Sequence, residues 1–291
     1  MASHPHSSEN EKNSYIFDPE SAAEMARLMS VDQFTTRGMG GPFAEQNHPT
    51  AFSKILDIAC GPGGWVLDVA FEHPTVEVAG VDLSKIMVDY ARARAHSQGL
   101  PNASFEVMDV TQPLQFSQNT FDLVNGRLLG GFLRRTDWPH VVEECSRILR
   151  PGGILRLTEL DIGGITTSGA FNHLNTLASR ALWHAGYGFS PDGETLCLTP
   201  MLSALLQQAG YQNIRQKPHA INFSAGTDSY MDLYRNYEVF FHLLKPMLLA
   251  TEVTTEEAFD HLYQQMLGEM LRDDFRGIWY FLTAWGTTPP E

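Results

Sequence analysis

The segment that most constrains the fold of this chain is Ile55-Leu56-Asp57-Ile58-Ala59-Cys60-Gly61-Pro62-Gly63-Gly64-Trp65. It starts as a short apolar run that contains a carboxylate, and it ends in a glycine-rich turn. A second apolar run follows at residues 76–81 and ends at Asp82. A strand, a glycine turn, a helix, a second strand and an acid together form the plan of a nucleotide-binding βαβ unit. This plan brings a helix N-terminus and a carboxylate to the same edge of a parallel sheet.

From residue 54 onward, the apolar patterns of the chain alternate between two periods. Strands are predicted at 55–59, 76–81, 103–108, 121–125 and 154–159. Helices are predicted at 63–72, from the N-cap Ser84 to residue 95, and from Asp137 to about residue 149. Strands that alternate with helices favour a parallel sheet covered on both faces.

The segments on either side of this core have a different character. Residues 1–14 are polar and predict a disordered leader, and helical spacing appears at 21–29. Later helices are predicted at 166–185, 199–210, 227–249 and 255–271, with a strand at 211–223. The aromatic-rich segment 275–285 has two apolar sides, which predicts a strand buried on both faces.

The composition restricts the classes of partner. The formal charge is −14, with 34 acidic residues against 20 lysines and arginines, and such a surface repels the phosphate backbone of DNA or RNA. Three separated cysteines without a CxxC pair fit reduced thiols. No window reaches the roughly 18 apolar residues of a membrane span. We therefore expect a cytoplasmic protein that binds no nucleic acid and has no membrane span.

Four sequence blocks follow one another in and after the βαβ unit. They are Leu56-Asp57-Ile58-Ala59-Cys60-Gly61-Pro62-Gly63-Gly64, Gly80-Val81-Asp82-Leu83-Ser84, Phe121-Asp122-Leu123-Val124 and Leu149-Arg150-Pro151-Gly152-Gly153. In this order and at these spacings, the chain resembles the class I S-adenosylmethionine-dependent methyltransferases of the small-molecule and quinone-biosynthesis type. The resemblance covers residues 54 to about 160 well, the final strands loosely and the other helical segments hardly at all.

The resemblance implies a Rossmann-like α/β fold. Its mostly parallel, seven-stranded sheet has helices on both faces, and its antiparallel last strand, here 275–285, inserts between strands five and six. Two helical cap insertions then lie over the carboxyl edge of the sheet. The expected segments are a disordered leader (1–14), an N-terminal helical lid (15–53), the cofactor-binding core (54–161), a cap insertion (162–195), a core helix with strand six (196–225), a second cap insertion (226–272), and the last core strand with a tail (273–291).

The resemblance also implies S-adenosyl-L-methionine as the cofactor. Gly61 and Gly63 let the backbone approach a ligand closely, and Asp57 holds the turn or reaches the cofactor ammonium through water. Asp82 would accept both ribose hydroxyls, although an acid in this place also serves as a helix N-cap. The cofactor-binding candidates are Tyr15, Gln33, Asp57, Ala59, Gly61, Gly63, Asp82, Leu83, Met87, Asp109, Val110, Asn125, Gly126 and Arg127.

Several of these candidates have a plain structural alternative. Asp109 would accept from the adenine amino group, or it is an ordinary polar turn residue. Arg127 would lie near the methionine end of the cofactor, or it is a solvated charge. Tyr15 and Gln33 would cover the cofactor from the leading helical segment, or they only pack.

The catalytic candidates are chosen from residue types near the carboxyl edge. Methyl transfer from a sulfonium is an in-line displacement in which alignment does most of the work, and a base is needed only if the nucleophile carries a proton. Glu159 and His184 are the first candidates, followed by Asp161, His173 and Tyr187. For both histidines, a surface or hydrogen-bonded role is the alternative. No metal site is predicted.

One helical face carries a row of aromatic residues, Tyr230, Tyr234, Tyr237 and Phe241. This row lines a pocket for a flat or apolar substrate, forms the core of the insertion, or forms a seam between two copies of the chain. A homodimer is therefore left open by the sequence.

The predicted function is transfer of a methyl group to a small organic acceptor, apolar or aromatic in character. One rival is an NAD(P)-dependent oxidoreductase, whose fingerprint requires a third glycine where this chain has Val66. The other rival is a non-catalytic S-adenosylmethionine-binding regulator. The sequence does not distinguish O-, N- or C-methylation.

Overall fold

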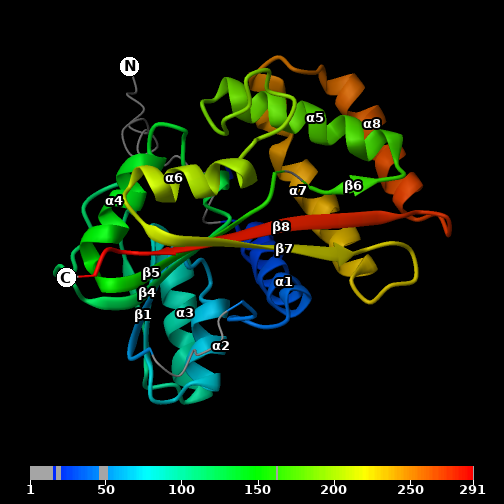
Figure 1. The fold of residues 1–291 in the computed structure, drawn as a ribbon. Coiled ribbons are helices and arrows are strands. Elements are labelled where there is room, and N and C mark those ends of the chain that lie inside the picture. Colours follow the sequence, from blue (N-terminus) through cyan, green and yellow to red (C-terminus); the bar gives the residue numbers. More distant parts are fainter. Residues whose placement is uncertain (1–15, 18–20, 46–51, 162, 291) are drawn as a thin grey trace, which may run out of the picture.

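The central sheet organises the molecule (Figure 1). A computed structural model describes residues 16–17, 21–45, 52–161 and 163–290. The sheet has eight strands in the order β3-β2-β1-β4-β5-β8-β6, and β7 pairs with β8 outside this path. The strands are β1 (Lys54–Ile58), β2 (Glu77–Asp82), β3 (Ala103–Val107), β4 (Phe121–Arg127), β5 (Leu149–Glu159), β6 (Ile165–Thr166), β7 (Gln212–Asn222) and β8 (Gly277–Thr287).

Helices cover the sheet and extend beyond it. The α-helices are α1 (Ala22–Met39), α2 (Gly64–Glu72), α3 (Lys85–Gln98), α4 (Trp138–Ile148), α5 (Gly169–His184), α6 (Leu202–Gln208), α7 (Tyr230–Ala250) and α8 (Glu256–Met270), and two short 3-10 helices are η2 (Leu129–Gly131) and η3 (Thr199–Met201). In Figure 1, α2 and α3 lie at one end of the molecule, whereas α5, α7 and α8 gather at the other end. Within the described ranges, no helix is both long and apolar enough to span a membrane.

The first five strands form the parallel part of the sheet, as the sequence predicts. Successive residues of β1 point to opposite faces. Ile55 packs with Trp65 of α2 on one face, and Leu56 packs with Val141 of α4 on the other. Both faces of this part are therefore buried, which explains its continuous apolar strands.

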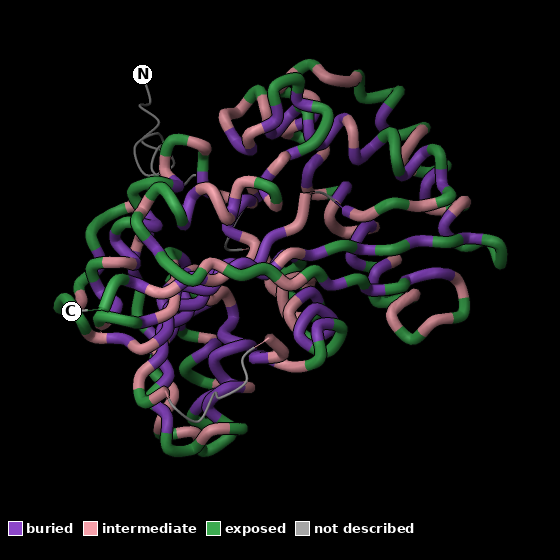
Figure 2. Tube along the Cα trace, viewed as in Figure 1, coloured by how far each residue is buried: buried purple, intermediate pink, exposed green. Residues whose placement is uncertain are grey.

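The antiparallel strand β8 runs between β5 and β7, which confirms the predicted position of the last strand. Its burial differs along its length. Trp279 and Phe281 are buried, but Ile278 and Tyr280 are 37% and 49% exposed. The prediction that this strand is buried on both faces is therefore wrong for its first half, where buried and exposed residues alternate (Figure 2).

The helices α5, α7 and α8 pack on one another and form what we call the cap. The core of the cap is aromatic, with Phe171, Tyr237 and Phe241 in mutual ring contact. The cap also includes a short strand that the sequence did not predict, β6, whose Ile165 pairs with Ile278 of β8.

Helix α1 is longer than the predicted 21–29. The Ser21 side chain accepts from the backbone N–H of Glu24 and caps its start, and Gly40 ends it in the left-handed conformation. The helix packs against α7 and β7. This contact holds α1 over the carboxyl edge of the sheet.

Candidate active site

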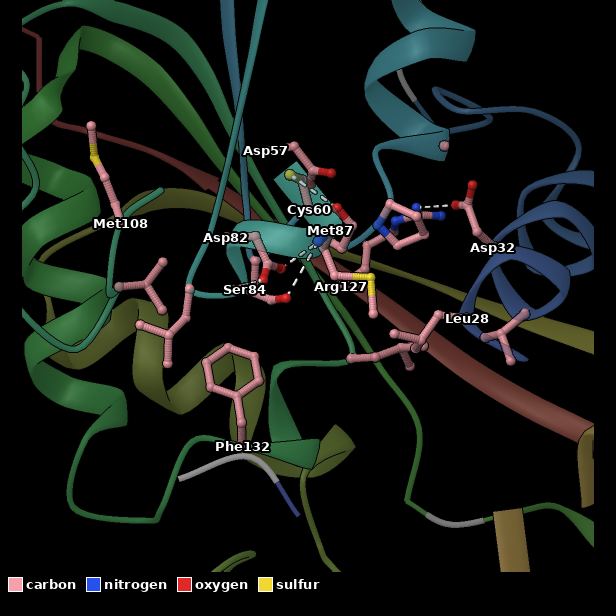
Figure 3. A pocket seen from close by; sticks show the side chains of 18 of the residues that line it. Leu28, Asp32, Asp57, Cys60, Asp82, Ser84, Met87, Met108, Arg127 and Phe132 are labelled. Atoms are coloured by element: carbon pink, nitrogen blue, oxygen red, sulfur yellow. Dashed lines mark hydrogen bonds and ion pairs between the residues drawn. The ribbon is translucent and has the colours of Figure 1, made fainter. Parts of the chain in front are cut away.

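A pocket lies at the carboxyl ends of β1, β2, β4 and β5, with α1 along one side (Figure 3). Its position is the one at which open α/β sheets bind ligands. The lining residues are Leu28, Val31, Asp32, Thr35, Asp57, Ala59, Cys60, Gly61, Pro62, Gly64, Asp82, Leu83, Ser84, Met87, Met108, Asp109, Val110, Arg127, Leu128, Phe132 and Thr158.

The glycine turn after β1 forms the floor of the pocket. Gly61 and Gly63 have φ angles of 53° and 77°, in the left-handed region that favours glycine. A Cβ atom on Gly63 would lie 2.7 Å from a ring carbon of Phe105. The turn therefore needs glycine at position 63 for both conformation and space.

Asp82 connects this turn to the start of α3. Its Oδ2 accepts from the backbone N–H of Gly61 at 2.8 Å, and its Oδ1 accepts from that of Ser84 at 2.9 Å. Burial raises the pKa of Asp82, and the two backbone N–H groups oppose the increase. A carboxylate has about four lone-pair sites, so the fixed Asp82 retains acceptor capacity toward the pocket.

The cap of α3 is Ser84, whose side chain accepts from the N–H of Met87 at 3.3 Å. The alternative role of Asp82 as the helix N-cap is therefore wrong.

A charged network closes the other end of the pocket. Arg127 at the end of β4 forms an ion pair with Asp32 of α1, and its Nη1 donates to Thr36 Oγ1 at 3.1 Å. Since the Arg127 side chain is 14% exposed, its alternative role as a solvated charge is wrong. Figure 3 shows Asp32 and Arg127 facing each other across the pocket wall.

Asp57 lies behind this ion pair and is buried. Its Oδ1 accepts from Asn125 Nδ2 at 2.7 Å. Asn125 Oδ1 in turn accepts from Arg156 Nη1 at 2.6 Å, and Arg156 pairs with Glu45. Burial raises the pKa of Asp57 to about 7, and Arg127 opposes the increase. Asp57 is thus held in place by a polar chain that crosses the sheet.

Nine of the predicted cofactor residues line the pocket. They are Asp57, Ala59, Gly61, Asp82, Leu83, Met87, Asp109, Val110 and Arg127. Gly63 and Asn125 support this lining from behind, through the turn and through Asp57. Gly126 is outside the lining, and a Cβ there would lie 3.0 Å from Leu129. Tyr15 lies outside the described residues.

Gln33 is exposed and does not line the pocket. The wall that α1 provides consists instead of Leu28, Val31, Asp32 and Thr35. These residues recur at the three- and four-residue spacing of one helical face, a signal that was present in the sequence.

None of the five catalytic candidates belongs to this lining. Glu159 is buried and accepts from the backbone N–H of Leu129 at 2.6 Å and of Gly130 at 3.3 Å. Burial raises its pKa to about 8. Asp161 accepts from the backbone N–H of Leu198 at 2.5 Å and from the Thr199 hydroxyl. Both acids hold backbone segments in place. Because the Thr199 hydroxyl donates to Asp161, it does not cap the helix predicted at 199–210.

The other three candidates lie on or next to α5. His173 and His184 are exposed, and Tyr187 is buried where its backbone bridges Arg134. A direct catalytic role for the two histidines does not agree with their places, because their helix presents them to solvent. Tyr237 and Phe241 form the core of the cap and do not line the pocket.

Comparison with known proteins agrees with this arrangement. Residues 55–153 match the family model described as a methyltransferase domain. A demethylmenaquinone methyltransferase of Symbiobacterium thermophilum is 32% identical over 153 residues, which are 50% of this chain and 59% of that protein. Over residues 55–153, the chain is thus similar to methyltransferase domains.

Other curated relatives of this chain have different names. The secondary metabolism regulator laeA of Coprinopsis cinerea is 37% identical over 108 residues, which are 37% of this chain and 25% of that protein. Methyltransferase pytC of Aspergillus terreus is 27% identical over 202 residues, 69% of this chain and 58% of that protein. The chain thus spans from 25% to 59% of the length of these three curated relatives.

Solved structures show a similar fold. A putative methyltransferase of Bacillus halodurans C-125 aligns with a TM-score of 0.52 at 17% identity, over 81% of this chain and 92% of that chain. A Haemonchus contortus phosphoethanolamine N-methyltransferase, in complex with phosphomonomethylethanolamine and S-adenosylhomocysteine, aligns with a TM-score of 0.51 at 20% identity, over 95% of this chain and 60% of that chain.

Proposed function

We propose that this chain binds S-adenosylmethionine in the pocket and transfers its methyl group to a small apolar acceptor. The observation that carries the proposal is the charge of the pocket. Among the described residues, the lining contains the carboxylates of Asp32, Asp57, Asp82 and Asp109 and a single guanidinium, that of Arg127. The cofactor has a sulfonium, an ammonium and one carboxylate, so its net charge is positive. This lining attracts such a ligand.

The same charge argues against the dinucleotide alternative. A pyrophosphate placed beside the carboxylates of Asp32, Asp82 and Asp109 would be repelled, and the guanidinium of Arg127 is already paired with Asp32. Dinucleotide sites instead offer backbone N–H groups and cationic side chains to the phosphates. Here the N–H of Gly61 already donates to Asp82.

The distribution of charge also suggests how the cofactor is oriented. A zwitterionic amino-acid end needs both signs of charge close together, and Arg127 beside Asp32 and Asp57 offers them. The nucleoside end would then lie along Asp82 and Asp109, with Leu83 against the base. Asp109 is fixed for this role because its Oδ1 accepts from the N–H and the hydroxyl of Thr111, at 2.9 and 2.7 Å.

The rest of the lining supports an apolar acceptor. Leu28, Val31, Leu128 and Phe132 face the pocket beyond the charged groups. When bound, the cofactor supplies an electrophilic methyl group on a good leaving group, and the protein contributes alignment and exclusion of water. Alignment of this kind is worth roughly 7–11 kcal/mol.

A non-catalytic regulator remains the second candidate because one relative is named a regulator. Both candidates predict cofactor binding, and only the first predicts turnover. Calorimetry with S-adenosylhomocysteine and with NADH tests the site, and transfer of tritium from methyl-labelled S-adenosylmethionine into a mixed metabolite extract tests turnover. We expect binding of S-adenosylhomocysteine, no binding of NADH, and labelled products. Binding of NADH alone would refute the proposal, whereas binding without transfer would favour the regulator.

A further inference from the structure

A line of buried hydroxyl and imidazole groups leads from the pocket into the sheet. Thr158 near the end of β5 belongs to the pocket lining. Its Oγ1 lies 2.9 Å from Thr283 Oγ1 on β8, and Thr283 Oγ1 lies 3.3 Å from His219 Nε2 on β7. Thr158 and Thr283 are fully buried, and His219 is 7% exposed. Three strands thus supply one hydrogen-bonded path that begins at the pocket.

The register of the sheet fixes this path. Thr283 pairs with Thr158 of β5 and with Lys217 of β7. Residues that pair across strands point to the same face, and so does a residue two positions further along a strand. The side chains of Thr158, Thr283 and His219 therefore share one face of the sheet, and the insertion of β8 between β5 and β7 brings them into contact.

Burying polar groups of this kind costs desolvation free energy, which the hydrogen bonds among them offset. A valine at position 158 or 283 would fit the strands without the desolvation cost of a hydroxyl. The chain instead places two hydroxyls and an imidazole in series, on the face of the sheet that also carries Arg127 and Arg156.

We propose that the Thr158–Thr283–His219 path is a proton relay that accepts the proton of the methyl acceptor. This inference rests on the proposed function of the pocket. Thr158 is the catalytic residue because it would touch the acceptor, and Thr283 and His219 act through it.

The step balances as a displacement coupled to proton transfer. The acceptor gives its proton to Thr158 Oγ1, the Thr158 hydroxyl proton moves to Thr283 Oγ1, and the Thr283 hydroxyl proton moves to His219 Nε2. The electron pair of the broken acceptor–hydrogen bond forms the new bond to the methyl carbon, and the pair of the broken sulfur–methyl bond stays on sulfur. The imidazolium returns its proton along the same path after the product leaves.

The charges around His219 keep its imidazole available as a proton acceptor. Burial lowers its pKa, Lys217 of β7 and Arg156 of β5 lower it further, and Glu45 in the segment after α1 opposes them. At neutral pH the ring is therefore neutral. One ring nitrogen then has a free lone pair, and the relay requires that this nitrogen is Nε2.

The relay restricts the class of acceptor. A tertiary amine or a thioether has no proton to lose on methylation and needs no relay. The structure therefore favours an acceptor with an apolar body and a nucleophile that carries a proton, such as a phenol, an enol or a thiol. The apolar body fits Leu28, Val31 and Phe132, and the nucleophile would lie against Thr158.

Kinetics of three variants and one control test the relay. His219→Asn and Thr283→Val interrupt it, Thr283→Ser restores the hydroxyl, and His242→Asn, at an exposed position of α7, is the matched control. Initial rates of labelled methyl transfer into the metabolite extract are measured between about pH 5.5 and pH 9, beside calorimetric affinity for S-adenosylhomocysteine. We expect the two interrupting variants to lose about 100-fold or more in rate, with unchanged affinity. Thr283→Ser and His242→Asn should retain the rate.

The pH profile gives a readout that a merely structural role would not change. The wild-type rate should fall on the acid side as His219 becomes protonated, and this fall should be absent from the residual rate of His219→Asn. Wild-type rates in His219→Asn and Thr283→Val would overturn the relay, and so would equal losses of rate and cofactor affinity. If the wild-type protein binds S-adenosylhomocysteine but transfers no label, the relay fails while the cofactor site stands.

A second measurement needs no acceptor. Imidazole ¹⁵N chemical shifts distinguish the two neutral tautomers, and the signal of His219 is assigned by its loss in His219→Asn. The relay requires an unprotonated Nε2 at pH 7. A proton on Nε2 at that pH would contradict the proposal, whatever the kinetics show.

Discussion

The two ends of the pocket are built by different means. At the end formed by β1 and β2, backbone groups do most of the work, because the N–H groups of Gly61 and Ser84 fix Asp82. At the end formed by α1, β4 and β5, side chains from distant segments meet, such as Asp32 and Arg127. A glycine turn and its hydrogen bonds to a carboxylate require particular residues at particular spacings, whereas contacts between side chains of distant segments can be made by many combinations of residues. The first end therefore has a sequence motif and the second has none.

The largest effect on stability is expected from a substitution of Gly63, in the first end of the pocket. In Gly63→Ala the methyl group would meet Phe105 at 2.7 Å and Ala91 at 2.8 Å, at a φ of 77°. We expect a loss of about 2–5 kcal/mol in the free energy of unfolding, measured with urea. Gly99→Ala is the control, because it has a φ of 67° but no atom within 4 Å of the added carbon, and it should cost about 1–2 kcal/mol. Equal losses would show that the close packing does not matter.

The pH dependence of the free energy of unfolding tests the burial of Glu159, at the end of β5. Burial raises its pKa in the folded state from 4.5 to about 8, so between these values the folded protein keeps a proton that the unfolded chain has lost. Its contribution to stability therefore falls as pH rises through this window. Glu159→Gln keeps an acceptor for Leu129 and removes the titration.

Between pH 5 and pH 8, we expect the free energy of unfolding of the variant to fall less than that of the wild type. The difference between the two decreases should be on the order of 2–4 kcal/mol. Urea unfolding across this range measures the difference. The titration of Asp57 is present in both proteins and cancels. Parallel stability curves would contradict the prediction.

Asp82→Ala tests whether the first end holds the cofactor. The change removes an acceptor aimed at the pocket and leaves the N–H groups of Gly61 and Ser84 without their partner. We expect calorimetric affinity for S-adenosylhomocysteine to fall about 10-fold or more, which is about 1.4 kcal/mol. Asp89→Ala, on the exposed side of α3, should bind as the wild type does. Unchanged affinity in Asp82→Ala would remove this residue from the site.

The smallest effect is expected in the cap. The Tyr237 hydroxyl donates to the backbone oxygen of Gly163 in a buried place. Tyr237→Phe should cost about 1 kcal/mol in urea unfolding and leave the affinity for S-adenosylhomocysteine unchanged. Tyr263→Phe, which removes a hydroxyl that donates to the backbone oxygen of Glu238 at a partly buried position, should cost less. A loss of cofactor affinity in Tyr237→Phe would show that the cap and the first end are coupled.

The sequence predicted the parallel half of the sheet well because its signals are local. Gly61, Gly63 and Ser84 mark a turn and a cap that need no distant partner. The prediction that Gln33 covers the cofactor shows the limit of such local signals. Its helix was recognised, but adjacent helical residues point about 100° apart, and the pocket side is occupied by Asp32.

The second end of the pocket could not be predicted because distant segments form it. His184 and His173 were chosen by residue type, and only the packing of α5 on α7 and α8 shows that both face solvent. His219 carried no signal of its own. It is linked to Thr158 through Thr283. His219 lies 61 positions after Thr158 and 64 positions before Thr283 in the sequence.

The place of β8 has a consequence for how the protein is made. This strand leaves the ribosome after every other strand of the sheet, yet it belongs between β5 and β7. Until residues 277–287 emerge, the pairing edge of β5 is open, and an open edge can recruit a strand of another nascent chain. Synthesis therefore includes an interval in which a chaperone that shields β5 would improve the yield of native protein.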